Sequence, residues 1–176
     1  EIYGGTFADD PSSQNGINYV AAGYESVYNE ETKTYSVVRV PAVAQIGEIT
    51  YRTLSAAIEA VEDGGTITMI AYEVFTETNR CDNGGWWDGL AYSGDKSFTI
   101  DLGGYTIKQD GSLNDYLIWI KNDGAKANTI TLKNGTMDAG TTAYSAFATA
   151  SSNKQTITVN LENINLINNN SNGAVV

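Results

Sequence analysis

The feature that most constrains the fold is an internal repeat of about 29 residues in the second half of the chain. One set of apolar residues recurs in pairs spaced five apart: Leu102 and Ile107, Leu132 and Met137, Leu161 and Leu166. A second set relates residues 116–120 to residues 144–148, 28 positions later. We expect a third copy of this second set to begin at Gly173-Ala174-Val175-Val176.

A period near 29 with several short strands per copy is typical of stacked coils. One coil cannot bury its inner face alone, so stacking places like residues above like and closes a continuous core. Neighbouring coils then pair in parallel, about 4.8 Å apart. Leucine-rich and helical repeats need a recurring helix, and no helical pattern follows residue 63. The repeat therefore predicts an all-β parallel β-helix.

The alternation of residues predicts which side chains face the core. Ile100 and Leu102 alternate with Asp101, which places the carboxylate outside, aligned with Thr131 and Asn160 of later coils. The second set matches Ile118 and Ile120 with Ala146 and Ala148, small apolar residues that suit the interior. Trp119 and Phe147 would then stack on the outer surface. The opposite register, with a buried Trp119 beside small neighbours, stays open.

One short helix is predicted at about residues 54–63. Its apolar stripe, at helical spacing, consists of Leu54, Ala57, Ile58 and Val61. Thr53 is a suitable N-cap, and Gly64 suits a left-handed residue after the helix. The narrow stripe indicates a helix that covers one apolar surface.

The charge balance excludes several partners. The net charge is −11 and the sequence pI is about 4.2, with 15 acidic against 5 basic residues in the first 96. Because no basic stripe exists, we expect neither nucleic acid nor an anionic membrane surface as a partner. No apolar run long enough to insert into a membrane is present. The acidic surface is explained by solvation, or by attraction to cations or to a basic protein.

The sequence offers little for catalysis. It has no histidine, and its one cysteine, Cys81, excludes an internal disulfide. Glycoside hydrolysis needs two carboxylates about 5–9.5 Å apart, and the acids of residues 97–176 do not align by the repeat. No zinc spacing or phosphate-binding loop appears, so no metal or cofactor is expected. We therefore do not expect an enzyme.

The best candidate for a binding site is the loop of residues 81–92, which interrupts the coil pattern. Two adjacent tryptophans, Trp86 and Trp87, are flanked by Asp88 and Tyr92. Flat aromatic faces stack on sugar rings or anchor protein interfaces. The alternative is that the loop folds back over the coils and buries one or both tryptophans. Trp119 and Phe147, if both lie outside, form a second candidate surface.

Three stretches resemble a known family. Residues 51–70 resemble the entry segment, residues 98–107 a typical coil, and residues 2–38 the closing segment of pectate-lyase-like, right-handed parallel β-helix units. Such units occur in large surface proteins of gut Firmicutes-type bacteria. The resemblance implies that residues 1–40 close a preceding unit. Residues 41–176 would then begin the next one, with its helix capping the first coils of a unit that is cut short at residue 176.

The resemblance implies display on the bacterial cell surface and a role in adhesion. We accordingly expect a non-catalytic extracellular binding module that recognises a host glycan, a host glycoprotein or another host protein such as an immunoglobulin. Two alternatives stay open. In the first, the chain is part of a polysaccharide-degrading enzyme whose catalytic residues lie outside it. In the second, it is a spacer that holds another domain away from the cell.

Overall fold

The computed structural model describes residues 1–82 and 84–173. The chain divides into two compact units, Glu1–Pro41 and Ala42–Val176. It is mostly β, with 49% of its residues in strands and one short helix. The third copy expected at residues 173–176 is not tested, because residues 174–176 lie outside the described residues.

The first unit is a three-stranded antiparallel sheet in the order β1-β3-β2. Its strands are β1 (Gly5–Phe7), β2 (Tyr24–Asn29) and β3 (Thr34–Arg39). Ala21 and Val37 are its buried hydrophobic residues, so its core is small. That this unit closes a preceding repeat stays a prediction.

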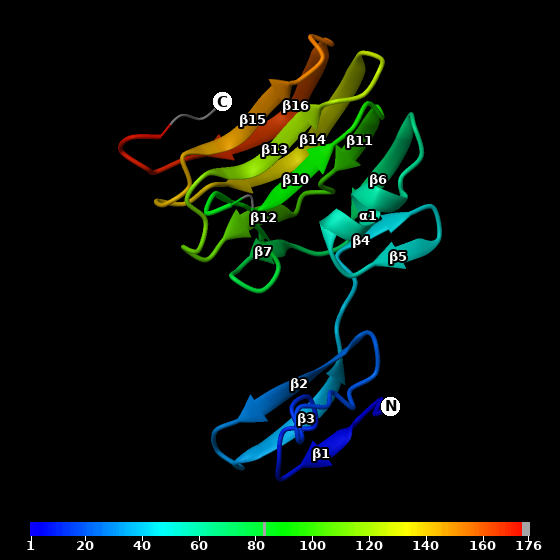
Figure 1. Ribbon diagram of the computed structural model, residues 1–176, viewed down its shortest axis with the longest axis vertical. Helices are drawn as coiled ribbons and strands as arrows, with labels where there is room; N and C mark the ends of the chain where they lie inside the picture. The colour runs from blue at the N-terminus through cyan, green and yellow to red at the C-terminus, as the bar shows by residue number, and fades with distance from the viewer. Residues whose placement is uncertain (83, 174–176) are drawn as a thin grey trace. The chain divides into compact units, whose positions relative to one another are not determined.

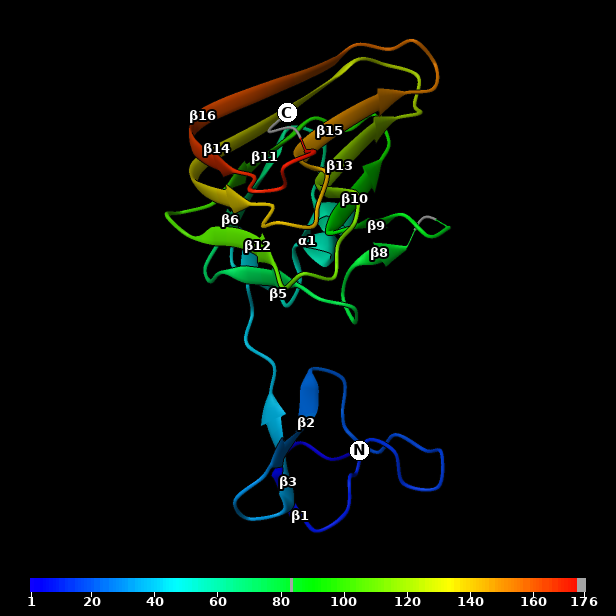
Figure 2. The same cartoon turned by 90° about the vertical axis from the view of Figure 1, so that its left-hand side faces the viewer.

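The second unit is a parallel β-solenoid of about four turns (Figure 1, Figure 2). The first coil contains β6 (Gly65–Met69), β7 (Glu73–Phe75) and β10 (Leu90–Ser93), with β8 (Cys81–Asp82) and β9 (Trp87–Asp88) inserted. The second contains β11 (Phe98–Asp101), β12 (Thr106–Gln109) and β13 (Tyr116–Asn122). Later coils contain β14 (Asn128–Asp138), β15 (Ser145–Ser151) and β16 (Ile157–Ile167). The predicted parallel stack is confirmed.

Apolar ladders run through the coils and form the core. On one face Ile67 pairs with Ile100, Ile100 with Leu132, and Leu132 with Leu161. On another face, Leu90 pairs with Ile118 and Ile118 with Phe147. All of these side chains are buried except Leu161, which lies in the last described strand and is 39% exposed. The pairing of main chains between coils therefore also aligns the side chains that exclude water.

Asparagine forms the corner of the later coils. Asn134 has a φ of 61° and Asn163, its counterpart one coil later, a φ of 53°. Asparagine tolerates this left-handed conformation better than most residues. The following Gly135 packs so tightly that a Cβ would lie 2.5 Å from that of Leu102. Asn134 and Asn163 therefore have a structural role at this corner.

The same corner corrects the predicted alignment of the first coils. Ile107 pairs with Met137 as the repeat predicts, but Leu132 pairs with Ile100 and not with Leu102. The second coil spends two more residues on its turn, at Gly103 and Gly104, than the bent strand β14 does. Asp101 consequently aligns with Lys133, not Thr131, and forms an ion pair of 3.4 Å with it.

The alignment predicted for the second set of repeats is also wrong by one residue. Ile118 pairs with Phe147, and Trp119 pairs with Ala148, a spacing of 29 and not 28. Ile118 and Ile120 face the core as predicted, and Phe147 is buried with them. The proposed outward stack of Trp119 on Phe147 is therefore wrong. A core position in line with Leu90 and Ile118 accepts an aromatic ring at least as well as it accepts alanine.

Helix α1 (Leu54–Ala60) lies at the start of the solenoid, where it packs on β10, β4 (Ala44–Ile46) and β5 (Ile49–Tyr51). The Thr53 side chain accepts a hydrogen bond from the Ala56 N–H at 3.1 Å, which confirms the N-cap. The four predicted stripe residues are all buried. The helix ends three residues early, and Gly64 takes its left-handed conformation in the following turn. No helix of the described chain is long and apolar enough to cross a membrane.

A buried carboxylate holds the helix to the first coil. Glu73 is 4% exposed and its Oε2 accepts a hydrogen bond from the Leu54 N–H at 2.9 Å. Its neighbour in the next coil is Ile107, so Glu73 takes the first position of an apolar ladder. Burial raises the pKa of Glu73 to about 7, although the hydrogen bond from Leu54 opposes the shift.

We predict that this glutamate makes the protein less stable at neutral pH. The folded protein holds the proton up to about pH 7, whereas the unfolded chain releases it near pH 4.5. The free energy of unfolding should therefore fall as the pH rises from about 4.5 to 7, by roughly 3 kcal/mol. Glu73→Gln should be as stable as the wild type at pH 4 and more stable at pH 8.

Urea unfolding of both proteins from pH 4 to 8 measures this effect. The difference between the two curves removes the contribution of the other carboxylates. A difference that does not change with pH would contradict the prediction.

Candidate functional site

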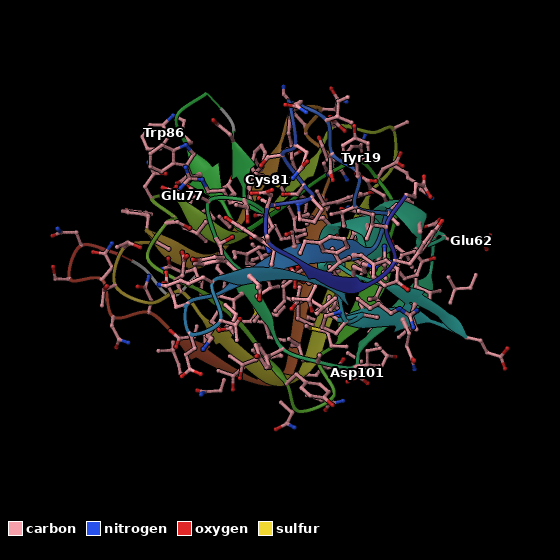
Figure 3. All side chains as sticks on the ribbon, turned by 90° about the horizontal axis from the view of Figure 1, so that it is seen from below. Tyr19, Glu62, Glu77, Cys81, Trp86 and Asp101 are labelled. Carbon is pink, nitrogen blue, oxygen red and sulfur yellow. The ribbon has the colours of Figure 1, made fainter. Side chains whose placement is uncertain are left out.

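The aromatic loop is a β-hairpin inserted into the first coil. Strands β8 and β9 pair antiparallel, and the turn between them includes Gly84 and Gly85, both with positive φ. The Asp82 carboxylate accepts a hydrogen bond from the Gly85 N–H at 3.0 Å. This turn leaves Trp86 60% exposed at the edge of the solenoid (Figure 3).

Trp87, the second tryptophan of the pair, is part of the structure of the coil. The Arg80 guanidinium lies 3.9 Å from the centre of the indole ring and donates a hydrogen bond to the Ser112 carbonyl. The main-chain N–H of Trp87 donates a hydrogen bond to Asn114 Oδ1 at 2.7 Å. Each of the two predicted alternatives therefore holds for one tryptophan. Trp86 is exposed, whereas Trp87 is half-buried under a cation.

Asp88 and Tyr92, the other candidates in this loop, face inward. Asp88 is 1% exposed and its Oδ1 accepts a hydrogen bond from the Tyr116 N–H of the next coil. Tyr92 is also buried, packs edge-on against Phe98, and accepts a hydrogen bond from the Lys96 N–H. Both side chains connect main-chain segments, so neither presents a free surface to a ligand.

The second candidate surface, Trp119 with Phe147, does not exist as predicted. Phe147 is 1% exposed. Trp119 is half-buried on the outer face, where its neighbours in the adjacent coils are Ala91 and Ala148. The small neighbours leave space for the indole ring to lie against the sheet.

The structure brings Trp86 together with three residues that the sequence analysis did not select. Trp86, Asp115, Tyr116 and Tyr144 line an open hollow of about 400 Å³. The ring centres of Tyr116 and Tyr144 are 6.5 Å apart, with their planes at 75°. Tyr144 is 50% exposed, whereas Tyr116 and Asp115 are half-buried. We refer to these four residues as the aromatic hollow.

Each coil contributes to the aromatic hollow from the same corner. The corners between the second and third strands are residues 76–89, 110–115 and 139–144 in successive coils. Main-chain hydrogen bonds connect them, from the Asp115 N–H to the Trp87 carbonyl and from the Tyr144 N–H to the Asp115 carbonyl. The stack therefore fixes the spacing of the side chains.

One acidic residue, Asp115, lies on the wall of the hollow. Burial raises the pKa of the Asp115 carboxyl, and an interaction with Tyr116 partly opposes that shift. Burial also raises the pKa of Tyr116, and the negative charges of Asp115 and Asp88 raise it further. Among the residues that the structure describes, no lysine or arginine lines the hollow. The site is thus suited to a neutral or cationic group and unsuited to an anion.

Tyr116 and Tyr144 had a signal in the sequence. They stand at the start of the two related segments, 28 residues apart. A tyrosine repeated at the edge of a coil indicates a shared corner, but the register places Tyr144 beside Asp115 and not above Tyr116. That diagonal placement depends on the one-residue difference between the predicted and observed spacing.

Nothing outside the chain assigns the site. Comparison with protein-family models, with curated proteins and with solved structures finds no match. Among the described residues, no group of three or more acidic, cysteine or histidine side chains is arranged to hold a metal ion. The aromatic hollow therefore has to be interpreted from its own chemistry.

We predict that substitution of the two adjacent tryptophans changes the stability of the protein to different extents. Trp87→Ala removes the ring beneath Arg80 and should lower the free energy of unfolding by about 2 kcal/mol. Trp86→Ala removes an exposed ring and should change it by about 0.5 kcal/mol or less. Urea denaturation followed by far-ultraviolet circular dichroism compares the two variants. Equal losses of stability would contradict the assignment of Trp87 to the framework.

Proposed function

We propose that the chain is a non-catalytic binding module of a bacterial surface protein, which holds a host glycan or a host protein at the aromatic hollow. The observation that carries the proposal is the exposure of Trp86 and Tyr144 around a common hollow. Exposed aromatic rings in one place favour association with a ligand, because they bury large apolar areas with few torsions to fix.

The composition of the hollow favours binding over hydrolysis. Its lining has one carboxylate, Asp115, and no second acid for the paired acid and base of a glycosidase. Asp95, another half-buried acid of the solenoid, accepts hydrogen bonds from the N–H groups of Ala125 and Lys126. The Asp95 carboxylate thus supports a coil and is not a second acid for the hollow, which agrees with a module that binds without reacting.

The surface location and the adhesive role belong to the same proposal. They rest on the resemblance of residues 51–70 and 98–107 to pectate-lyase-like units of bacterial surface proteins. The parallel solenoid is consistent with that resemblance. The net charge of −11 is consistent with a module displayed in solvent.

We predict that a double substitution in the hollow abolishes ligand capture. The full chain is immobilised and exposed to a glycan array, to purified mucin and to purified immunoglobulin. Whichever of these the wild type binds, Trp86→Ala with Tyr144→Ala should bind at least about tenfold more weakly, because each ring supplies hot-spot contact area.

The matched control is Tyr72→Ala, since Tyr72 is 64% exposed and does not line the hollow. It should bind as the wild type does. Equal binding by the double variant and the wild type would place the contact elsewhere on the chain. Binding of none of these ligands by the wild type would favour the spacer.

A further inference from the structure

The geometry of the aromatic hollow indicates the kind of group that it holds. A sugar that stacks on the faces of both Tyr116 and Tyr144 needs their planes to be roughly parallel, but these planes meet at 75°. Two steeply inclined rings with Trp86 on the same hollow form walls around a compact group instead. Aromatic walls of this kind attract cations, because the face of each ring carries negative charge density.

The Asp115 carboxylate of the hollow differs from those acids of the solenoid that are paired with lysine. Three acids of the solenoid form ion pairs with lysine: Asp63 with Lys126, Asp101 with Lys133 and Asp123 with Lys121. None of the ion pairs found among the described residues includes Asp115. A half-buried carboxylate beside aromatic rings is therefore left to attract a positive charge from outside the chain.

The charge of the surroundings points the same way. Asp88 lies beneath Tyr116 and adds a second negative charge near the ring. Arg80, which directly precedes the hairpin, is already held by the Trp87 ring and the Ser112 carbonyl. An anionic sugar or phosphate would meet repulsion here, and a neutral sugar would leave Asp115 without a counter-charge.

We propose that the aromatic hollow binds a basic side chain, a lysine ammonium or an arginine guanidinium, presented on the surface of a protein partner. The cation lies against the rings of Trp86, Tyr116 and Tyr144, and Asp115 supplies its counter-charge. The inference rests on the proposed binding function and names the partner as a protein with an exposed basic residue.

Titration by nuclear magnetic resonance tests the inference directly. The indole N–H signal of Trp86, assigned by its loss in Trp86→Phe, reports on the hollow in the ¹⁵N-labelled full chain. The probes are capped Gly-Lys-Gly and Gly-Arg-Gly peptides, the same tripeptide with neutral citrulline, and N-acetylglucosamine. A single site of this kind should bind a short basic peptide with a dissociation constant on the order of 1 mM.

The expected result is that the lysine or the arginine peptide shifts the Trp86 signal and that the citrulline peptide does not. The preferred peptide identifies the cation. Asp115→Asn keeps the shape of the side chain and removes its charge, so it should weaken binding about tenfold. Glu62→Gln, which removes a distant exposed charge, should bind within about twofold of the wild type (Figure 3).

Each contrary outcome is distinct. Equal binding of arginine and citrulline peptides, or undiminished binding by Asp115→Asn, would overturn the cation site. A shift with N-acetylglucosamine alone would also overturn it, but would leave the proposed binding function standing with a glycan as ligand. No shift with any probe would overturn the cation site, while capture of mucin or immunoglobulin by the wild type tests the binding function separately.

Discussion

The pairing of each coil with the one before it is the constraint on which the rest of the structure depends. A coil such as residues 98–122 has no inner face that it can bury alone, so its apolar side chains are covered by the coils on either side. The parallel main-chain bonds between coils fix the register, and the register decides that Ile67, Ile100 and Leu132 form one buried ladder. Core and hydrogen bonding are therefore one arrangement, and a change of one residue in a corner moves every side chain that follows it.

A stack of this kind needs a device at its end, because the first coil would otherwise expose a strand edge. Here β4 pairs antiparallel with β6, and helix α1 covers the apolar surface beside it. Glu73 connects the two parts through its hydrogen bond to Leu54. A carboxylate with a pKa near 7 is costly at this position, but it satisfies a helix N–H that would otherwise be buried without a partner.

Much of the framework could be predicted from the sequence, because it follows from periodicities. The apolar pairs Ile107 with Met137 and Leu132 with Leu161 identified the coils, and the stripe from Leu54 to Val61 identified the helix. The corners could not be predicted in the same way. Gly103 and Gly104 lengthen one turn by two residues, and the spacing of β13 and β15 is 29 and not 28. These small differences turned Phe147 into the core and placed Lys133 beside Asp101, and a periodicity averaged over the repeat does not contain them. Trp86 was found as an unusual pair of tryptophans, whereas Asp115, Tyr116 and Tyr144 became a site only through the register.

The different positions of Trp86, which is exposed, and Trp87, which belongs to the framework, show how such a site can arise on a repetitive fold. Trp87, held by Arg80 and by main-chain bonds to Asn114, extends the pairing of the first coil outward. The hairpin turn beyond that pairing projects Trp86 outside the core. The corners of the next two coils already lie beside it and supply Asp115 and Tyr144 at spacings set by the stack. The core constrains the length of these corners but not the chemical type of their outward side chains. In the proposed cation site, the Asp115 carboxylate among three aromatic rings would serve the ligand, whereas the core places no demand on it.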